Sequence, residues 1–350
     1  MTAREQTKQV PVGNVSLGGG SPVLVQSMLN VPAGDVAGNV AQAVRLEKAG
    51  CEILRVAVPT LEDARLVTAI KEKTSIPLVA DIHFDYKIAL ACAERGVDKI
   101  RINPGNIGED SRVKAVAVAC RERGIPIRIG VNSGSVEKHI LAKHGAPTAE
   151  ALCESALYHV GLLEKFDFTD IVIALKSSHV PTMVQAYRRM SRLTRYPLHL
   201  GVTEAGTVRA GLLKSGAGIG ALLLDGIGDT IRISLTADPA EEVAAGKELL
   251  RALGLRRQGP SLVACPTCGR TQINLIPLAE QVEEYLRTVD KPITVAVMGC
   301  VVNGPGEARE ADIGIAGGKK EGLIFKKGEI LRKVPEERLL EELKQEIALL

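Results

Sequence analysis

The stretch PLVADIHFDYKIALACAERGVDKIRIN, residues 77–103, contains one complete strand–helix–strand pattern. Residues 77–83 and 98–103 are short runs rich in Val, Ile and Leu, as buried parallel strands are. The segment between them, 86–95, is helix-like and ends at Gly96, a residue type that commonly terminates helices. The stretch therefore predicts two neighbouring parallel strands joined by a helix.

The same pattern continues on both sides of this stretch. Further strand-like runs cover 21–28, 52–58, 126–132, 170–176, 197–203 and 230–235. Helix-like segments alternate with them at 36–49, 61–73, 109–123, 148–165, 180–194, 206–224 and 239–253. Alternation of this length, over about 250 residues, is typical of a closed (β/α)8 TIM barrel. A doubly wound open sheet is the alternative, because alternation alone does not show that a sheet closes.

Both flanks of the predicted barrel differ from it in pattern. Residues 9–21, QVPVGNVSLGGGS, alternate around Gly13-Asn14 like a hairpin that could plug the barrel floor. Residues 255–260 read as a linker between a barrel at 1–254 and a smaller α/β domain at 261–350. In that smaller domain we expect strands at 261–264, 293–299, 311–317 and 322–328, and helices at about 277–289 and 335–348.

Composition excludes several classes of protein. The 350 residues carry a net charge of +3 and only 3% aromatic residues, which argues against binding nucleic acid through bulk charge or base stacking. No run approaches the roughly 18 apolar residues of a membrane span. The polar start, MTAREQTKQV, lacks the apolar region of a signal peptide. We therefore expect the protein to be cytoplasmic. In that compartment its seven cysteines would stay reduced.

Polar and charged side chains stand where the predicted strands end, and in a barrel these ends face the active site. Five of them are cationic, and arginine forks match the oxygens of phosphate groups. Internal ion pairs with Asp81 and Glu204 are the alternative for any single arginine. Five cations together favour a phosphate or diphosphate ligand. The residues at the strand ends are Arg55, Asp81, His83, Arg101, Asn103, Arg128, Asn132, Lys176, Glu204, Arg232 and Ser234.

Three cysteines lie close together in the smaller domain. Cys265 and Cys268 form a C-x-x-C turn, and Cys300 follows in a glycine-rich segment that also contains Glu307. Three thiolates and one oxygen ligand would suit an iron–sulfur cluster with an unusual fourth ligand. A structural zinc site and free thiols are the alternatives, although a zinc ribbon normally contains a second C-x-x-C or C-x-x-H motif. The other four cysteines are expected to be buried in or beside helices.

Long motifs throughout the chain resemble one known family, the bacterial 4-hydroxy-3-methylbut-2-enyl diphosphate synthases of the methylerythritol phosphate pathway. The motifs are VQSM (25–28), RVAVPT (55–60), PLVADIHFDYKIAL (77–90), RINPGNIG (101–108), IPIRIGVNSGS (125–135), PLHLGVTEAG (197–206), GIGDTIRISL (226–235), ACPTCGR (264–270) and GCVVNGPGEA (299–308).

The resemblance implies a barrel and a [4Fe–4S] domain in a homodimer. If the short linker cannot fold the second domain onto its own barrel, the two chains share a site, and a site within one chain is the alternative. It implies reductive ring opening and dehydration of 2-C-methyl-D-erythritol 2,4-cyclodiphosphate to (E)-4-hydroxy-3-methylbut-2-enyl diphosphate. Flavodoxin or ferredoxin would supply the two electrons. A phosphate-binding barrel lyase or transferase with a structural zinc module is the alternative function, and a non-enzymatic zinc-ribbon binding module is a third.

The resemblance also implies roles for individual residues. It places the cluster ligands at Cys265, Cys268, Cys300 and Glu307, and the proton donor at Glu204. Glu204 and Glu307 are thus the expected catalytic residues. The expected substrate-binding residues are Arg55, His83, Arg101, Asn103, Arg128, Asn132, Lys176, Arg232 and Ser234.

Overall fold

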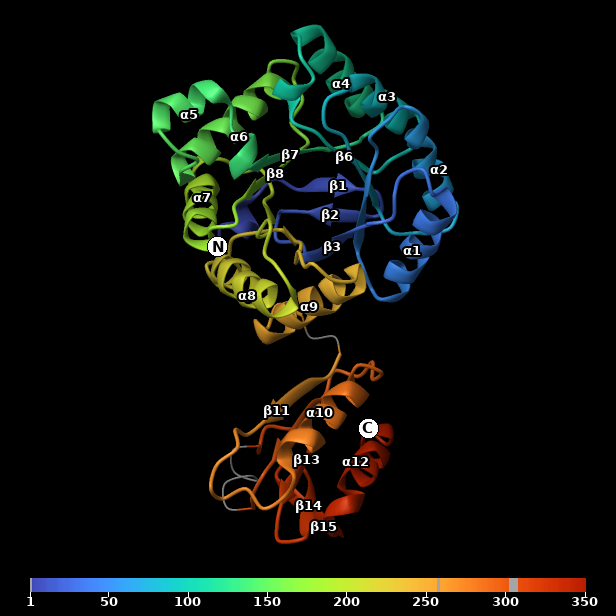
Figure 1. Cartoon of the computed structure of the whole chain (residues 1–350), viewed down its shortest axis with the longest axis vertical. Coiled ribbons are helices and arrows are strands. Elements are labelled where there is room, and N and C mark those ends of the chain that lie inside the picture. The colour runs from blue at the N-terminus through green and yellow to red at the C-terminus, as the bar shows by residue number, and fades with distance from the viewer. Residues whose placement is uncertain (1, 257–258, 302–307) are drawn as a thin grey trace. The chain divides into compact units, whose positions relative to one another are not determined.

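The structure is a computed structural model that describes residues 2–256, 259–301 and 308–350. The chain divides into two compact units, residues 1–255 and 256–350 (Figure 1). Each unit has its own hydrophobic core.

The first unit is built on an eight-stranded parallel sheet in the order β8-β7-β6-β5-β4-β3-β10-β9. A parallel bridge between Ile173 and Leu198 joins the two ends of this order, so the sheet closes into a barrel. The TIM barrel predicted from the sequence is therefore confirmed, and the open sheet is wrong. The barrel strands are β3 (Leu24–Met28), β4 (Ile53–Ala57), β5 (Leu78–Asp81), β6 (Lys99–Arg101), β7 (Ile127–Asn132), β8 (Ile171–Lys176), β9 (His199–Leu200) and β10 (Thr230–Ile231).

Helices surround the barrel strands (Figure 1). Their apolar faces and the outward faces of the strands form one continuous core. One helix, α5, was not expected from the sequence and precedes the predicted helix α6. The helices are α1 (Val36–Lys48), α2 (Arg65–Lys71), α3 (Tyr86–Glu94), α4 (Asp110–Glu122), α5 (Lys138–His144), α6 (Ala149–Glu164), α7 (Val180–Leu193), α8 (Val208–Leu224) and α9 (Pro239–Ala252).

The amino-terminal hairpin closes one end of the barrel. Strands β1 (Val10–Val12) and β2 (Val15–Leu17) pair antiparallel, and Gly13 in their turn has a φ of +56°, which favours glycine. Its buried side chains pack on residues at the amino ends of four barrel strands, as predicted. These contacts join Val10, Val12 and Leu17 to Leu24, Ile53, Val79 and Val172. The opposite end, where the strands terminate, is thereby left for a site.

The second unit is a five-stranded mixed sheet with helices α10 (Leu275–Leu286) and α12 (Leu339–Ala348). Its first three strands, β11 (Ser261–Ala264), β12 (Thr294–Met298) and β13 (Ile313–Gly317), are parallel. Strands β14 (Glu321–Lys326) and β15 (Glu329–Pro335) add antiparallel pairs. We did not predict β15, because its charged residues Glu329, Arg332 and Lys333 interrupt the apolar run expected of a buried strand, and only Val334 is buried.

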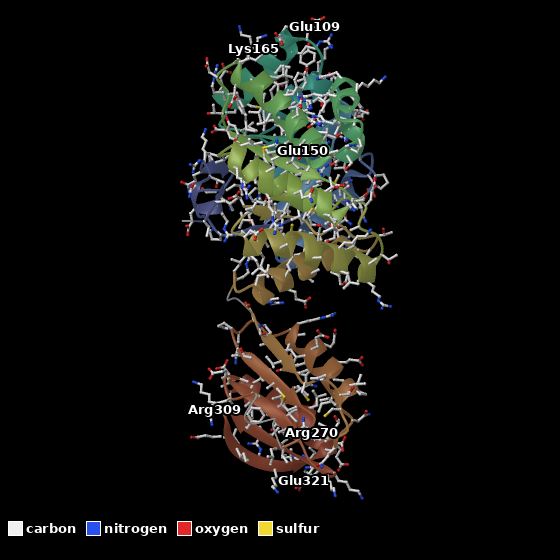
Figure 2. The ribbon with its side chains drawn as sticks, turned by 90° about the vertical axis from the view of Figure 1, so that its left-hand side faces the viewer. Glu109, Glu150, Lys165, Arg270, Arg309 and Glu321 are labelled. Atoms are coloured by element: carbon white, nitrogen blue, oxygen red, sulfur yellow. The ribbon has the colours of Figure 1, made fainter. Side chains whose placement is uncertain are left out.

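Charged side chains stand on the outer surface of the barrel unit. Glu109, Glu150 and Lys165 are among the exposed charged side chains that project from and beside its helices (Figure 2). In the part of the chain that the structure describes, no helix has the length and apolar character needed to cross a membrane.

Candidate active site

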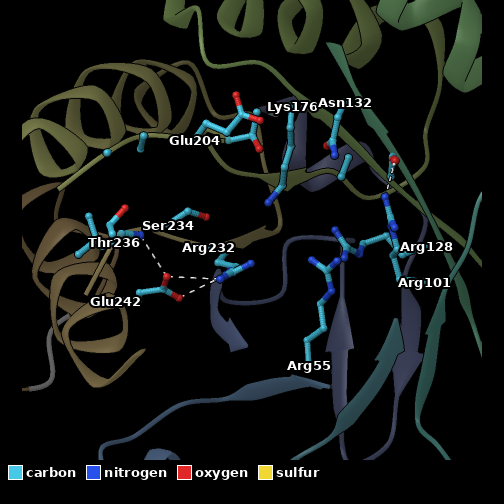
Figure 3. A pocket seen from close by; sticks show the side chains of 16 residues that line it. Arg55, Arg101, Arg128, Asn132, Lys176, Glu204, Arg232, Ser234, Thr236 and Glu242 are labelled. Carbon is cyan, nitrogen blue, oxygen red and sulfur yellow. Dashed lines mark hydrogen bonds and ion pairs between the residues drawn. The ribbon is translucent and has the colours of Figure 1, made fainter. Parts of the chain in front are cut away.

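A pocket of about 320 Å³ opens where the barrel strands end. Five cationic side chains line it, and each comes from a different strand or from the residues just after one. Their charged groups are directed toward one central space (Figure 3). Eight residues predicted from the sequence line this pocket: Arg55, Arg101, Arg128, Asn132, Lys176, Glu204, Arg232 and Ser234.

Two of the arginines share one buried carboxylate. Arg55 Nη2 lies 2.5 Å from Asp81 Oδ2, and Arg101 Nη1 lies 3.1 Å from Asp81 Oδ1. Burial raises the pKa of the Asp81 carboxyl, but the guanidiniums of Arg55 and Arg101 outweigh burial and hold this pKa well below its usual range. Asp81 therefore stays ionised and holds both arginines in place at the pocket wall.

Arg128 and Lys176 lack such a partner. Within the described residues, no hydrogen-bond partner is found for Arg128 Nε or Nη2, and no ion pair for Lys176. Burial lowers the pKa of both groups well below the ordinary value, and the neighbouring cations lower it further. A buried cation without a counter-ion is costly, so both side chains would gain from a bound anion.

Arg232 pairs with Glu242, an acid that we did not predict. Glu242 lies on α9, only 3% of the residue is exposed, and its carboxylate oxygens lie 3.3 Å from Arg232 Nε and Nη2. The burial of Glu242 could have been predicted from the sequence. Pro239, Val243, Gly246 and Leu250 form the buried stripe of α9, and Glu242 falls on this stripe at helical spacing.

Two predicted residues lie outside the pocket lining. Asn103 is buried, and its side-chain amide bonds to both backbone groups of Gly130. His83 is exposed, and its Nε2 lies 3.3 Å from Arg101 Nη1. Their part in substrate binding remains a prediction.

Glu204 follows β9 and has a φ of +51°, in the left-handed region that side chains other than glycine rarely adopt. Strained backbone of this kind is concentrated at functional sites. The residue is exposed and belongs to the pocket lining. An ionisable carboxyl is thus presented to a space otherwise dominated by cations.

Two cysteines of the second unit lie at the carboxyl ends of neighbouring strands of its sheet. Cys265 directly follows β11, and Cys300 follows β12, the parallel neighbour of β11. Gly299 N–H donates to Cys265 Sγ at 3.1 Å. Hydrogen bonds from Arg270 lower the pKa of the exposed Cys268 thiol.

These thiols have the donor chemistry of a soft-metal or cluster site. The described residues alone do not complete one, since no group of three or more His, Cys, Asp or Glu side chains is placed among them to hold a metal. Glu307, the predicted fourth ligand, lies outside the described residues.

The remaining four cysteines are buried, as expected. Burial raises the pKa of each thiol to about 12, so they stay protonated. These are Cys51, Cys92, Cys120 and Cys153.

A barrel with a cationic pocket at its strand ends, followed by a unit with free thiols, is typical of a TIM-barrel enzyme whose pocket suits an anionic ligand. Residues 7–247 match the GcpE TIM-barrel domain, and residues 261–349 match the GcpE protein C-terminal domain. The chain therefore belongs to the GcpE family.

Curated relatives give the enzyme class. The chain is 56% identical over 347 residues to 4-hydroxy-3-methylbut-2-en-1-yl diphosphate synthase (flavodoxin) of Bacillus mycoides (strain KBAB4). It is equally similar to the protein of that name from Bacillus anthracis. Each alignment covers 99% of this chain and 95% of the relative. The enzyme is an oxidoreductase of isoprenoid biosynthesis, as predicted, and the zinc-module alternative is not favoured.

Solved structures agree on the barrel alone. A dihydropteroate synthase from Vibrio fischeri ES114 has a TM-score of 0.52 at 14% identity, covering 71% of this chain and 98% of that chain. A Yersinia pestis dihydropteroate synthase has a TM-score of 0.51 at 13% identity, covering 71% and 100%. At such identities the likeness concerns the fold.

Proposed function

We propose that this enzyme converts 2-C-methyl-D-erythritol 2,4-cyclodiphosphate into (E)-4-hydroxy-3-methylbut-2-enyl diphosphate. The observation that carries the proposal is the meeting of five cationic side chains in one pocket at the strand ends. A diphosphate supplies the negative charge that such a pocket needs. The names of the curated relatives support the same reaction.

The five cationic side chains have different roles in substrate binding. Arg128 and Lys176, which no described carboxylate neutralises, bind the diphosphate charge directly. Arg55 and Arg101 are held by Asp81, and they orient the ring through the guanidinium nitrogens that Asp81 leaves free. The side chains of Asn132 and Ser234 add hydrogen bonds to the substrate, and Arg232 completes the cationic wall. The buried Asn103 supports this shell through its bonds to Gly130, and the exposed His83 contacts Arg101.

Glu204 supplies the proton that the reaction needs. Ring opening and dehydration take up two electrons and release one water molecule, so the departing hydroxyl must be protonated. A carboxyl at the pocket can deliver that proton as a general acid.

The thiols of the second unit and Glu307 would hold a [4Fe–4S] cluster. When bound, such a cluster supplies one-electron transfer. Gly299 N–H would donate to the Cys265 sulfur, and Arg270 would stabilise the Cys268 thiolate. Anaerobically purified protein should contain about four iron atoms per chain and absorb broadly near ~400 nm. A colourless zinc protein would contradict this assignment.

Substitutions of Glu307 test the proposed set of cluster ligands most directly. Its oxygen is harder than a thiolate and should leave iron more readily, which would let substrate approach. Glu307→Cys should retain near-normal iron content and lose most turnover, and Glu307→Ala should lose iron. Full turnover in Glu307→Cys would overturn the idea of an exchangeable fourth ligand.

Flavodoxin is the electron donor that the names of the relatives favour, with ferredoxin as the alternative, and we place the reaction in the cytoplasm. We further propose a homodimer in which one chain supplies the barrel pocket and the other its thiols. Mixing Arg101→Ala chains with Cys300→Ala chains should then restore activity in some heterodimers. Confirmed heterodimers without activity would favour a site within one chain.

Turnover of the cyclodiphosphate with reduced flavodoxin tests the proposed function. Arg101→Ala should raise KM on the order of tenfold or more, because a charge-assisted contact is lost, and should leave the cluster spectrum intact. Arg95→Ala, an exposed arginine beyond α3, is the matched control. An unchanged KM in Arg101→Ala would remove Arg101 from the site.

A further inference from the structure

Glu242 is the most heavily hydrogen-bonded carboxylate that lines the pocket in the described part of the chain. Its Oε2 accepts from Arg232 Nε at 3.3 Å and from Ser27 Oγ at 3.0 Å. Its Oε1 accepts from Arg232 Nη2 at 3.3 Å and from the backbone N–H of Leu235 at 3.1 Å. Each oxygen therefore receives one guanidinium nitrogen and one further donor.

These four bonds span the seam of the barrel. Ser27 belongs to β3, the first barrel strand, and Arg232 and Leu235 follow β10, the last one. Strands β3 and β10 pair directly, with Ile231 opposite Val25. Glu242 itself comes from α9, so one carboxylate joins the first strand, the last strand and the last helix of the barrel.

The bonds also fix the orientation of Arg232. A guanidinium held through Nε and Nη2 by one carboxylate has a defined plane, and its Nη1 is left on the other edge. Nη1 has the soft sulfur of Met28 at 3.5 Å. Arg232 is thus oriented before any ligand binds, whereas Arg128 and Lys176 have no described carboxylate to orient them.

We propose that Glu242 is a positioning residue for this reaction, acting on the substrate through Arg232. The inference rests on the proposed function, because it presumes that Arg232 contacts the cyclodiphosphate. Coulomb's law alone makes the opposite prediction, since removing a negative charge from the pocket wall would strengthen the binding of an anion.

Glu242→Gln separates these two effects. An amide has one acceptor and one donor end, and each end faces one Arg232 nitrogen in either orientation. The NH2 group therefore opposes an N–H of Arg232 whichever way the amide is turned, and the guanidinium loses its fixed plane. We expect the Kd for the cyclodiphosphate, measured by calorimetry without reductant, to rise on the order of tenfold.

The decisive experiment is a double-mutant cycle that combines Glu242→Gln with Arg232→Met. If Glu242 acts through Arg232, Glu242→Gln should weaken binding about tenfold in the natural background and less than about twofold in Arg232→Met. A purely structural role at the barrel seam would give the same loss in both backgrounds and would overturn the inference. Tighter binding in Glu242→Gln would also overturn it.

Two further variants keep the test decisive. Glu241→Gln removes the same charge from the neighbouring, exposed position of α9 and should leave Kd unchanged. Glu242→Asp keeps the charge but withdraws it by one methylene group, so it tests the inference even if Glu242→Gln does not fold. Weaker binding by Glu242→Asp supports positioning, and binding equal to that of the natural protein contradicts it.

The failures of the two proposals are distinguishable. If Arg232→Met alone binds and turns over the cyclodiphosphate normally, the assignment of Arg232 within the proposed function is wrong. If Arg232→Met is impaired and Glu242→Gln is not, only the inference about Glu242 is wrong.

Discussion

The side-chain amide of Asn103 pairs with both backbone groups of Gly130 on the neighbouring strand. Asn103 Nδ2 donates to Gly130 O at 3.0 Å, and Asn103 Oδ1 accepts from Gly130 N at 2.9 Å. Gly130 O also accepts from Arg101 Nη2 at 2.9 Å. The amide thus continues the β6–β7 pairing beyond the end of β6 and fixes the strand on which Arg128 and Asn132 lie.

This pairing predicts a stability effect for Asn103→Ala. The change leaves the buried N–H of Gly130 without its partner, so the free energy of unfolding should fall by about 2–3 kcal/mol. Urea denaturation measures it, with Asn106→Ala, an exposed asparagine in the following turn, as the control. A variant with unchanged stability and a raised KM would instead make Asn103 a substrate ligand.

Arg128→Met should stabilise the protein and weaken substrate binding together. The residue is 1% exposed, and Nε and Nη2 have no hydrogen-bond partner among the described residues. Replacing an unpaired buried charge by an apolar group of similar length relieves desolvation, on the order of 1–3 kcal/mol. Thermal unfolding of the substrate-free protein should show a higher Tm, and calorimetry should show weaker binding of the cyclodiphosphate. A lowered Tm would show that Arg128 is compensated within the protein.

Much of this site follows from strand periodicity alone. Alternation along β6 and β7 places Arg101 and Arg128 inside the barrel, and the ends of parallel strands meet at one mouth. The ion pairs at the barrel mouth do not follow from strand periodicity, because they depend on which helix places an acidic side chain beside an arginine. Glu242 belongs to α9 and reaches Arg232 only after the barrel closes.

The second unit shows the same limit. The carboxyl ends of β11 and β12 place Cys265 and Cys300 at one edge, as their positions in the sequence suggest. The antiparallel strand β15 was not predicted, because charged residues interrupt its apolar ones and only Val334 is buried.

Asp229 should make stability depend on pH. Burial raises the pKa of its carboxyl to about 6, although hydrogen bonds from Leu198 and Thr7 oppose the shift. An unfolded aspartate titrates near about 3.9, so the folded state binds more protons between about pH 4 and pH 6. Stability contributed by the protonated carboxyl is therefore lost as the pH rises through this window.

Asp229→Asn removes this titration and serves as the reference. The free energy of unfolding of the natural protein, minus that of Asp229→Asn, should fall by about 2–3 kcal/mol from pH 4 to pH 7. Denaturation at several pH values measures the difference, in which the contributions of all other groups cancel. A difference that stays flat with pH would show that Asp229 keeps an ordinary pKa.

The central claim is that the cationic pocket at the strand ends binds the cyclic diphosphate. A crystal structure of the enzyme with 2-C-methyl-D-erythritol 2,4-cyclodiphosphate tests it most directly. The account predicts diphosphate oxygens within about 3.2 Å of the Arg128 guanidinium and of Lys176 Nζ. A diphosphate bound elsewhere, with Arg128 and Lys176 still without an anion, would contradict it.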